Sequence, residues 1–138
     1  MQNITLNNGV EIPILGFGVY QIAPKDTKSA VLNAIKAGYR HFDTAQAYAN
    51  EKEVGEAIRE SRIDRKEFFI TSKVWLSNYG YDKAYASVLE SLDRMELDYL
   101  DLMLLHQPFS DYYGAYHALE KLERLVCLIS IQIVSATL

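Results

Sequence analysis

The sequence predicts an α/β fold in which a parallel sheet has strands joined by crossover helices. Strand-like and helical segments alternate four times along the chain, which is the pattern of consecutive β-α-β units. Residues 102–105 are apolar at every position, as expected for a strand buried on both faces. Hydrophobic residues make up 49% of the 138 residues, which excludes a disordered or low-complexity chain.

A small β-hairpin is expected to precede the alternating units. Residues 5–12 contain Asn8 and Gly9 between short apolar flanks, a pattern typical of a type I′ turn. Residues 14–18 are expected to form a short strand. Its glycines would let a ligand or another backbone approach closely.

Four helices are predicted from apolar residues that recur every three or four positions. They are expected at residues 25–37, 51–61, 81–95 and 111–122. Gly38 suits the position after the first helix, and Asp82 is expected to cap the third. The strands that alternate with these helices are expected at residues 39–43, 68–74 and 99–105. The last fourteen residues, from Leu125, carry no charge and are compatible with a fifth strand.

Composition excludes several classes of protein. A single cysteine, Cys127, rules out an intrachain disulfide and fits a reducing compartment, so we expect a cytoplasmic protein. A net charge of −4 and a pI near 5.3 argue against nucleic-acid binding. No signal peptide is visible, and the longest apolar run is too short to span a membrane. No metal-binding spacing is present, and a complete (β/α)8 barrel would need roughly 250 residues.

Titratable residues follow three of the predicted strands. Asp43 ends one strand, Lys73 lies near the end of the next, and His106 follows the last, while Tyr48 lies in the loop after Asp43. The carboxyl ends of parallel strands gather at one face, where active sites are built. We therefore expect a carboxylate, an ammonium, a phenol and an imidazole to converge there.

Each of these groups suits a step in the reduction of a carbonyl compound. A phenol has a pKa of about 10, and a neighbouring cation such as Lys73 would lower the pKa of Tyr48 by stabilising the phenolate. Asp43 would neutralise the buried ammonium, and His106 would bind a substrate oxygen or relay a proton. Because side chains cannot deliver a hydride, this chemistry implies a nicotinamide cofactor.

Structural interpretations of the same residues remain open at this stage. An aspartate after a strand is often a helix cap, a lysine at a strand end is often solvated, and His106 before Gln107 suits a turn. His41 and His117 follow no such pattern and are interpreted as structural residues.

Three motifs in the right order resemble those of the aldo-keto reductases, in the bacterial branch that reduces small aldehydes and ketones. The motifs are Gly-Tyr-Arg-His-Phe-Asp-Thr-Ala at residues 38–45 with Tyr-Ala-Asn-Glu at 48–51, Ile-Thr-Ser-Lys-Val-Trp at 70–75, and Tyr-Leu-Asp-Leu at 99–102 with Leu-His-Gln-Pro at 105–108. Residues 15–20 also look like the family's first barrel strand. The resemblance covers about residues 4–122.

The resemblance implies a (β/α)8 barrel, of which this chain would form roughly the first four to five β/α units. It also implies NADPH as cofactor and a small aldehyde or ketone as substrate. Tyr48 would donate the proton, Lys73 would lower its pKa, Asp43 would pair with Lys73, and His106 would orient the carbonyl group. The implied cofactor-binding residues are Gly18, Val19, Tyr20, Asp43 and Thr44, and the implied substrate pocket comprises Tyr20, Trp75 and His106.

The resemblance stops after Leu122. We therefore expect residues 1–122 to be the N-terminal half of a reductase barrel and residues 123–138 to be a divergent apolar tail. The Ser-Asn pair, the aromatic residue under the nicotinamide and the basic phosphate loop of the family are absent. One reverse translation of residues 134–138 gives Val-Ser-Asn-Phe in another reading frame, which suggests a frameshift near residue 123.

The predicted function is NADPH-dependent reduction of aldehydes or ketones, weak or absent in the chain alone. The alternatives are a non-catalytic binding or regulatory module and an inactive remnant of the same fold. An incomplete barrel has open sheet edges and an uncovered apolar layer, so we expect poor solubility or self-association through those edges.

Overall fold

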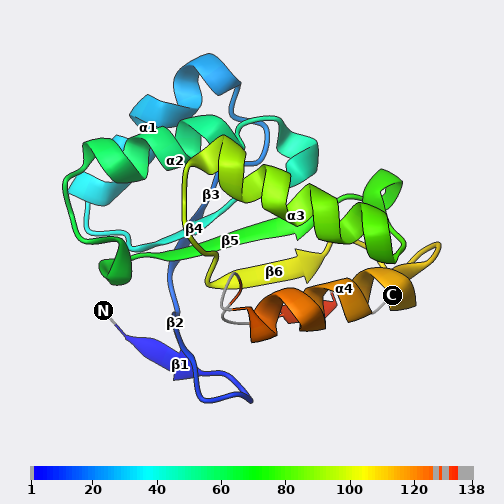
Figure 1. Cartoon of the computed structure of the whole chain (residues 1–138). Helices are drawn as coiled ribbons and strands as arrows, with labels where there is room; N and C mark the ends of the chain where they lie inside the picture. The colour runs from blue at the N-terminus through cyan, green and yellow to red at the C-terminus, as the bar shows by residue number, and fades with distance from the viewer. Residues whose placement is uncertain (1, 126–127, 129–130, 134–138) are drawn as a thin grey trace.

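Five short strands run parallel in one sheet and follow one another in chain order in a computed structural model, which describes residues 2–125, 128 and 131–133 (Figure 1). They are β3 (Gly16–Gly18), β4 (His41–Asp43), β5 (Phe69–Val74), β6 (Leu102–Leu105) and β7 (Ile131–Ile133). The predicted α/β class and parallel sheet are therefore confirmed, as is a fifth strand in the uncharged tail. The other residues beyond Leu125, including Cys127 and the frameshift motif at 134–138, lie outside the described residues.

Four helices connect the strands and pack against one another in chain order (Figure 1). They are α1 (Pro24–Lys36), α2 (Glu51–Glu60), α3 (Tyr81–Met95) and α4 (Tyr112–Arg124), and three short 3-10 turns, η1 (Gln46–Tyr48), η2 (Arg65–Glu67) and η3 (Leu76–Asn78), lie between elements. Because each helix contacts the next, all four lie on the same side of the sheet. Their apolar stripes face it, as the periodicity predicted.

The N-terminal hairpin is present, but its turn differs from the predicted one. Strands β1 (Asn3–Thr5) and β2 (Glu11–Pro13) pair in an antiparallel manner. The Gly9 N–H donates to the Leu6 carbonyl, and only Gly9 in this turn has a positive φ, of 85°. A type I′ turn needs positive φ at two central residues, so that prediction was wrong. The glycine instead takes the left-handed position that ends a three-residue loop, between Leu6 and Val10.

The helix ends agree with the sequence at one predicted position and not at the other. Gly38 follows α1 with a φ of 100°, and its N–H donates to the Ile35 carbonyl, which confirms its role at the helix end. Asp82 is not the cap of α3, because Gly80 precedes the helix and Asp82 lies inside its first turn. Gly80 has a φ of 93°, which ends the preceding segment and sets the helix start at Tyr81.

The core lies between the sheet and the helices. Every residue of β5 is buried, whereas β6 leaves Leu104 half-buried. Leu89 of α3 lies outside this core and is 41% exposed. In the described part of the chain, none of the helices combines the length and apolar character that crossing a membrane requires.

Candidate active site

Strand register places three of the predicted site residues on the same face of the sheet. Asp43 of β4 lies opposite Thr71 of β5, and Lys73, two residues further, lies opposite Leu104 of β6. His106 lies two residues beyond Leu104. Because side chains alternate along a strand, steps of two residues keep Asp43, Lys73 and His106 on one face.

Lys73 is the buried centre of this cluster. Its side-chain amine donates to Asp43 Oδ1 at 2.5 Å and to the Thr44 carbonyl at 2.8 Å, and the residue is only 8% exposed. The amine also lies 5.1 Å from the centroid of the Tyr48 ring. The interpretations of Asp43 as a helix cap and of Lys73 as a solvated lysine are therefore wrong: the buried ammonium pairs with the partly exposed carboxylate of Asp43 next to the phenol.

Tyr48 ends the η1 turn, and its ring lies 5.0 Å from the Tyr20 ring and 5.8 Å from the His106 ring between centroids. Burial raises the pKa of Tyr48, and the charge of Asp43 and the neighbouring Tyr20 raise it further. The net shift is therefore opposite to the lowering expected from Lys73, because burial and Asp43 outweigh the effect of the ammonium. A physical reason is that the ammonium is paired with Asp43, whose negative charge opposes its effect on the phenol.

His106 is held in the neutral form. Burial lowers its pKa, and the nearby positive charge of Lys73 acts in the same direction. The imidazole Nδ1 is buried and has no hydrogen-bond partner among the residues that the structure describes, and the ring centroid lies 5.0 Å from that of Trp75. A neutral imidazole can donate from one nitrogen and accept at the other, so a ligand oxygen is a suitable partner for this group.

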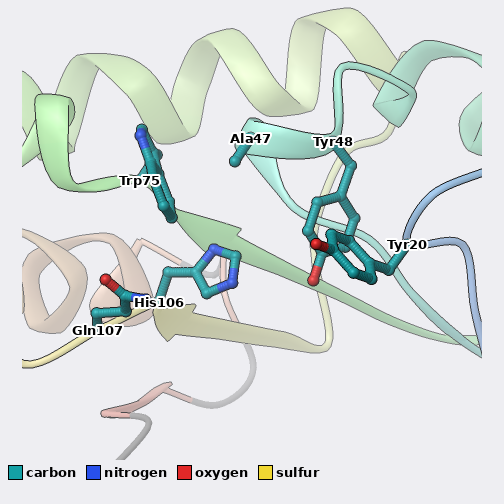
Figure 2. Close-up of a pocket in the computed structure, with 6 residues that line it drawn as sticks. All are labelled: Tyr20, Ala47, Tyr48, Trp75, His106 and Gln107. Atoms are coloured by element: carbon teal, nitrogen blue, oxygen red, sulfur yellow. The ribbon is translucent and has the colours of Figure 1, made fainter.

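A cavity of about 520 Å³ opens beside these rings. Figure 2 shows Tyr48 and Tyr20 lying side by side, across the cavity from Trp75 and His106. Its lining residues are Tyr20, Ala47, Tyr48, Trp75, His106 and Gln107. The predicted substrate-pocket residues therefore come together around one cavity.

The predicted cofactor-binding residues are arranged less uniformly. Tyr20 is 64% exposed at the cavity, and Gly18 faces open space where a side chain would otherwise lie. Val19 and Thr44 are fully buried and do not line the cavity. The Thr44 hydroxyl donates to Asn50 Oδ1 at 2.8 Å, so this side chain is bonded to another buried residue and does not face the cavity.

Three residues that hold the site in place were not identified from the sequence. Asn50 is buried and donates to the carbonyls of Val19 and Ile22 at 3.0 and 3.2 Å. Gln46 accepts from the Trp75 N–H at 2.9 Å, and Tyr79 bonds to the Gln107 backbone. Their contacts span long stretches of chain, so no local pattern signalled them.

His41 and His117 lie outside this cluster. His41 Nε2 lies 3.1 Å from Thr71 Oγ1, and its ring packs edge-on against Phe69. His117 pairs with Glu120 on the exposed face of α4 at 2.7 Å. Both sets of contacts fit the structural roles predicted for these histidines.

Comparisons with known proteins agree with the resemblance seen in the motifs. A family model described as the aldo/keto reductase family matches residues 14–131. A morphine 6-dehydrogenase from Pseudomonas putida is 46% identical over 123 residues, which are 89% of this chain and 42% of that protein. A glyoxal reductase from Bacillus subtilis is 48% identical over 121 residues, which are 86% of this chain and 44% of that protein.

Solved structures show the same partial correspondence. An aldo/keto reductase from Brucella melitensis superposes with a TM-score of 0.94 at 41% identity, covering 96% of this chain and 53% of that one. An aldo-keto reductase from Bombyx mori in complex with NADP gives a TM-score of 0.91 at 32% identity, covering 96% and 50%. The chain thus spans about half the length of these relatives. With a family match across most of its residues, it belongs to the aldo/keto reductase family.

Proposed function

We propose that this chain carries the acid–base residues of an NADPH-dependent reductase that converts small aldehydes or ketones to alcohols. The observation that supports the proposal best is the Lys73–Asp43 pair, formed at 2.5 Å beneath the ring of Tyr48. The buried ammonium of this pair has lost most of its hydration, and ionisable groups held in such an arrangement are typical of functional sites in which a neighbouring group changes its charge. Tyr48 is that neighbouring group.

The proposed reaction uses Tyr48 as the proton donor. Because the pKa of Tyr48 is raised by burial, the phenol holds its proton at neutral pH until a bound substrate accepts it. The substrate carbonyl oxygen accepts hydrogen bonds from the Tyr48 hydroxyl and from the neutral imidazole of His106. The phenolic proton then moves to that oxygen, and Lys73 stabilises the phenolate that remains. Bound NADPH supplies the hydride that reaches the carbonyl carbon.

The cavity beside Tyr48 supports a nicotinamide ring next to a small carbonyl compound, since 520 Å³ lies within the usual range of ligand sites. Of the predicted cofactor-binding residues, we propose that Gly18, Tyr20 and Asp43 contact the cofactor, while Val19 and Thr44, which are fully buried, support them from the interior. The names of two relatives, a glyoxal reductase and a morphine 6-dehydrogenase, support a carbonyl or hydroxyl substrate.

The chain matches less than half of the length of the two reductase and dehydrogenase relatives described above. We propose that residues 1–122 correspond to the N-terminal half of the barrel, that residues 123–138 diverge from it through a frameshift, and that turnover by the 138 residues alone is weak. We also propose a cytoplasmic location and self-association through β3 and β7, each of which pairs with a single strand among the described residues.

A Tyr48→Phe substitution tests the proposed chemistry. We expect it to lower NADPH-dependent turnover of glyoxal by at least about 100-fold, because general acid catalysis contributes roughly that much or more. NADPH binding, followed by cofactor fluorescence, should be preserved. The matched control is Tyr113→Phe, which removes a hydroxyl from a residue that is 68% exposed on α4.

Two outcomes would contradict the proposal. Measurable NADPH-dependent turnover that is the same in the unmodified chain and in Tyr48→Phe would show that Tyr48 is not the proton donor. A chain that neither binds NADPH nor oxidises it would instead favour a non-catalytic module of the same fold.

A further inference from the structure

The imidazole of His106 is positioned without any hydrogen bond of its own. Among the described residues, its ring contacts Tyr48 and Trp75, and its Nδ1 is buried without a partner. Ring contacts alone restrain rotation weakly, because aromatic pairs accept several geometries. The direction of the imidazole therefore depends on how the backbone at residues 106 and 107 is held.

Two tethers hold this backbone. The His106 N–H donates to the Val74 carbonyl at 3.2 Å, which continues the pairing of β5 and β6. At the next residue, the Tyr79 hydroxyl donates to the Gln107 carbonyl at 2.7 Å and accepts from the Gln107 N–H at 3.1 Å. The same carbonyl also accepts from the Phe109 N–H at 3.0 Å. The Tyr79 hydroxyl is thus hydrogen-bonded to both the backbone carbonyl and the backbone N–H of Gln107.

Tyr79 is itself held firmly. It is only 6% exposed and belongs to the apolar core between the sheet and the helices. It follows η3 and precedes Gly80, whose N–H donates to the Asp111 carbonyl at 3.2 Å. A buried side chain on an anchored backbone is a rigid support for whatever its hydroxyl holds.

We propose that Tyr79 is a positioning residue that fixes the His106 imidazole at the cavity by clamping the backbone of Gln107. The proposal rests on the proposed function, in which His106 binds the carbonyl oxygen. Gln107 also lines the cavity, so its hydrogen bonds to Tyr79 fix the part of the cavity wall next to the imidazole as well as the orientation of the imidazole.

The test replaces Tyr79 by Phe, which removes the hydroxyl and keeps the ring. NMR titration of the three imidazoles follows His106, whose signal is assigned by its absence in His106→Gln. We expect the pKa of His106 to rise towards its ordinary value, because a released backbone lets water reach the ring. The charges of Lys73 and Asp43 stay in place and do not account for such a rise. The value of kcat/KM for glyoxal should fall by roughly 10- to 100-fold, since small misplacements have effects of this size.

The matched control is Tyr85→Phe, at a partly buried tyrosine of α3 that packs on the core and for which no hydroxyl hydrogen bond is present among the described residues. It should leave the titration of His106 unchanged. A second measurement needs no variant: amide hydrogen exchange at Gln107 in the unmodified chain should be at least about tenfold slower than in an unstructured peptide.

The proposal is overturned if His106 titrates identically in Tyr79→Phe and in the unmodified chain, or if the Gln107 amide exchanges without protection. These readouts need neither substrate nor cofactor. Absence of Tyr48-dependent turnover would therefore overturn the proposed function, while the NMR results would still decide the role of Tyr79.

Discussion

Replacing Asn50 by Ala should destabilise the protein far more than an average substitution. Asn50 is fully buried just before α2, where its side chain makes no capping hydrogen bond to the helix. Its amide instead joins two loops: Oδ1 accepts from the Thr44 hydroxyl at 2.8 Å, and Nδ2 donates to the carbonyls of Val19 and Ile22 at 3.0 and 3.2 Å. The Thr44 backbone carbonyl in turn accepts from Lys73.

The expected loss follows from these three hydrogen bonds, to which Nδ2 adds a longer one of 3.4 Å to the Thr27 hydroxyl. Each contributes about 1 kcal/mol net, and an unpaired buried partner costs about 1–3 kcal/mol. Alanine leaves the Thr44 hydroxyl without its acceptor, whereas the Val19 and Ile22 carbonyls each keep one other donor, the Ile22 N–H and the Thr27 hydroxyl. The space that the side chain vacates admits water, which offsets part of the cost. We therefore expect the free energy of unfolding to fall by about 3–5 kcal/mol, a large share of the roughly 5–15 kcal/mol typical of a domain.

Urea denaturation followed by circular dichroism measures this loss. Asn33→Ala is the matched control, because Asn33 lies exposed on α1 and the substitution removes no interior hydrogen bond. It should change the free energy of unfolding by less than about 0.5 kcal/mol. A loss below about 1 kcal/mol for Asn50→Ala would refute the view that its amide holds the two loops together.

Two further perturbations follow from packing and from titration. Gly55→Ala should destabilise the chain by at least about 2 kcal/mol in the same assay, because the new methyl group would meet the backbone carbonyl of Met95 where α2 crosses the end of α3; unchanged stability would contradict this close contact. Burial lowers the pKa of both His41 and His106, so the unfolded chain binds more protons and the melting temperature should fall as pH drops below about 6.5. His117→Gln should show the same slope, and a flat profile would contradict buried neutral histidines.

Much of the fold could be predicted because it depends on local patterns. The helix at residues 81–95 was predicted from periodicity alone and has those bounds in the structure. Details that depend on the φ of single residues were harder to predict. Asn8-Gly9 suits two kinds of turn, and which one forms depends on the strands that the turn must join. Similarly, Asp82 is a good capping residue that lies two residues too late, because Gly80 fixes the start of the helix.

At the candidate site, residue identities were easier to predict than electrostatics. The approach of Asp43 to Lys73 follows from their places at neighbouring strand ends. The pKa of Tyr48 does not follow from those places, since it depends on how burial and Asp43 outweigh a cation that lies 5.1 Å from the ring centroid. The sequence indicates that Asp43 and Lys73 pair, but the net effect of these two charges on the pKa of Tyr48 depends on distances of a few ångströms.

The register that aligns the site is fixed at the opposite end of the strands. A slip of one residue between β5 and β6 would turn Lys73 or His106 to the other face. The Asp101 carboxylate prevents this by accepting the Ile70 N–H at 2.8 Å and pairing with Arg65 at 2.6 Å. Burial raises the pKa of Asp101, whereas Arg65 opposes that rise and favours the charged form that accepts both contacts. Because an unpaired carboxylate there would be costly, the ion pair restricts β5 and β6 to the register in which Lys73 and His106 share a face.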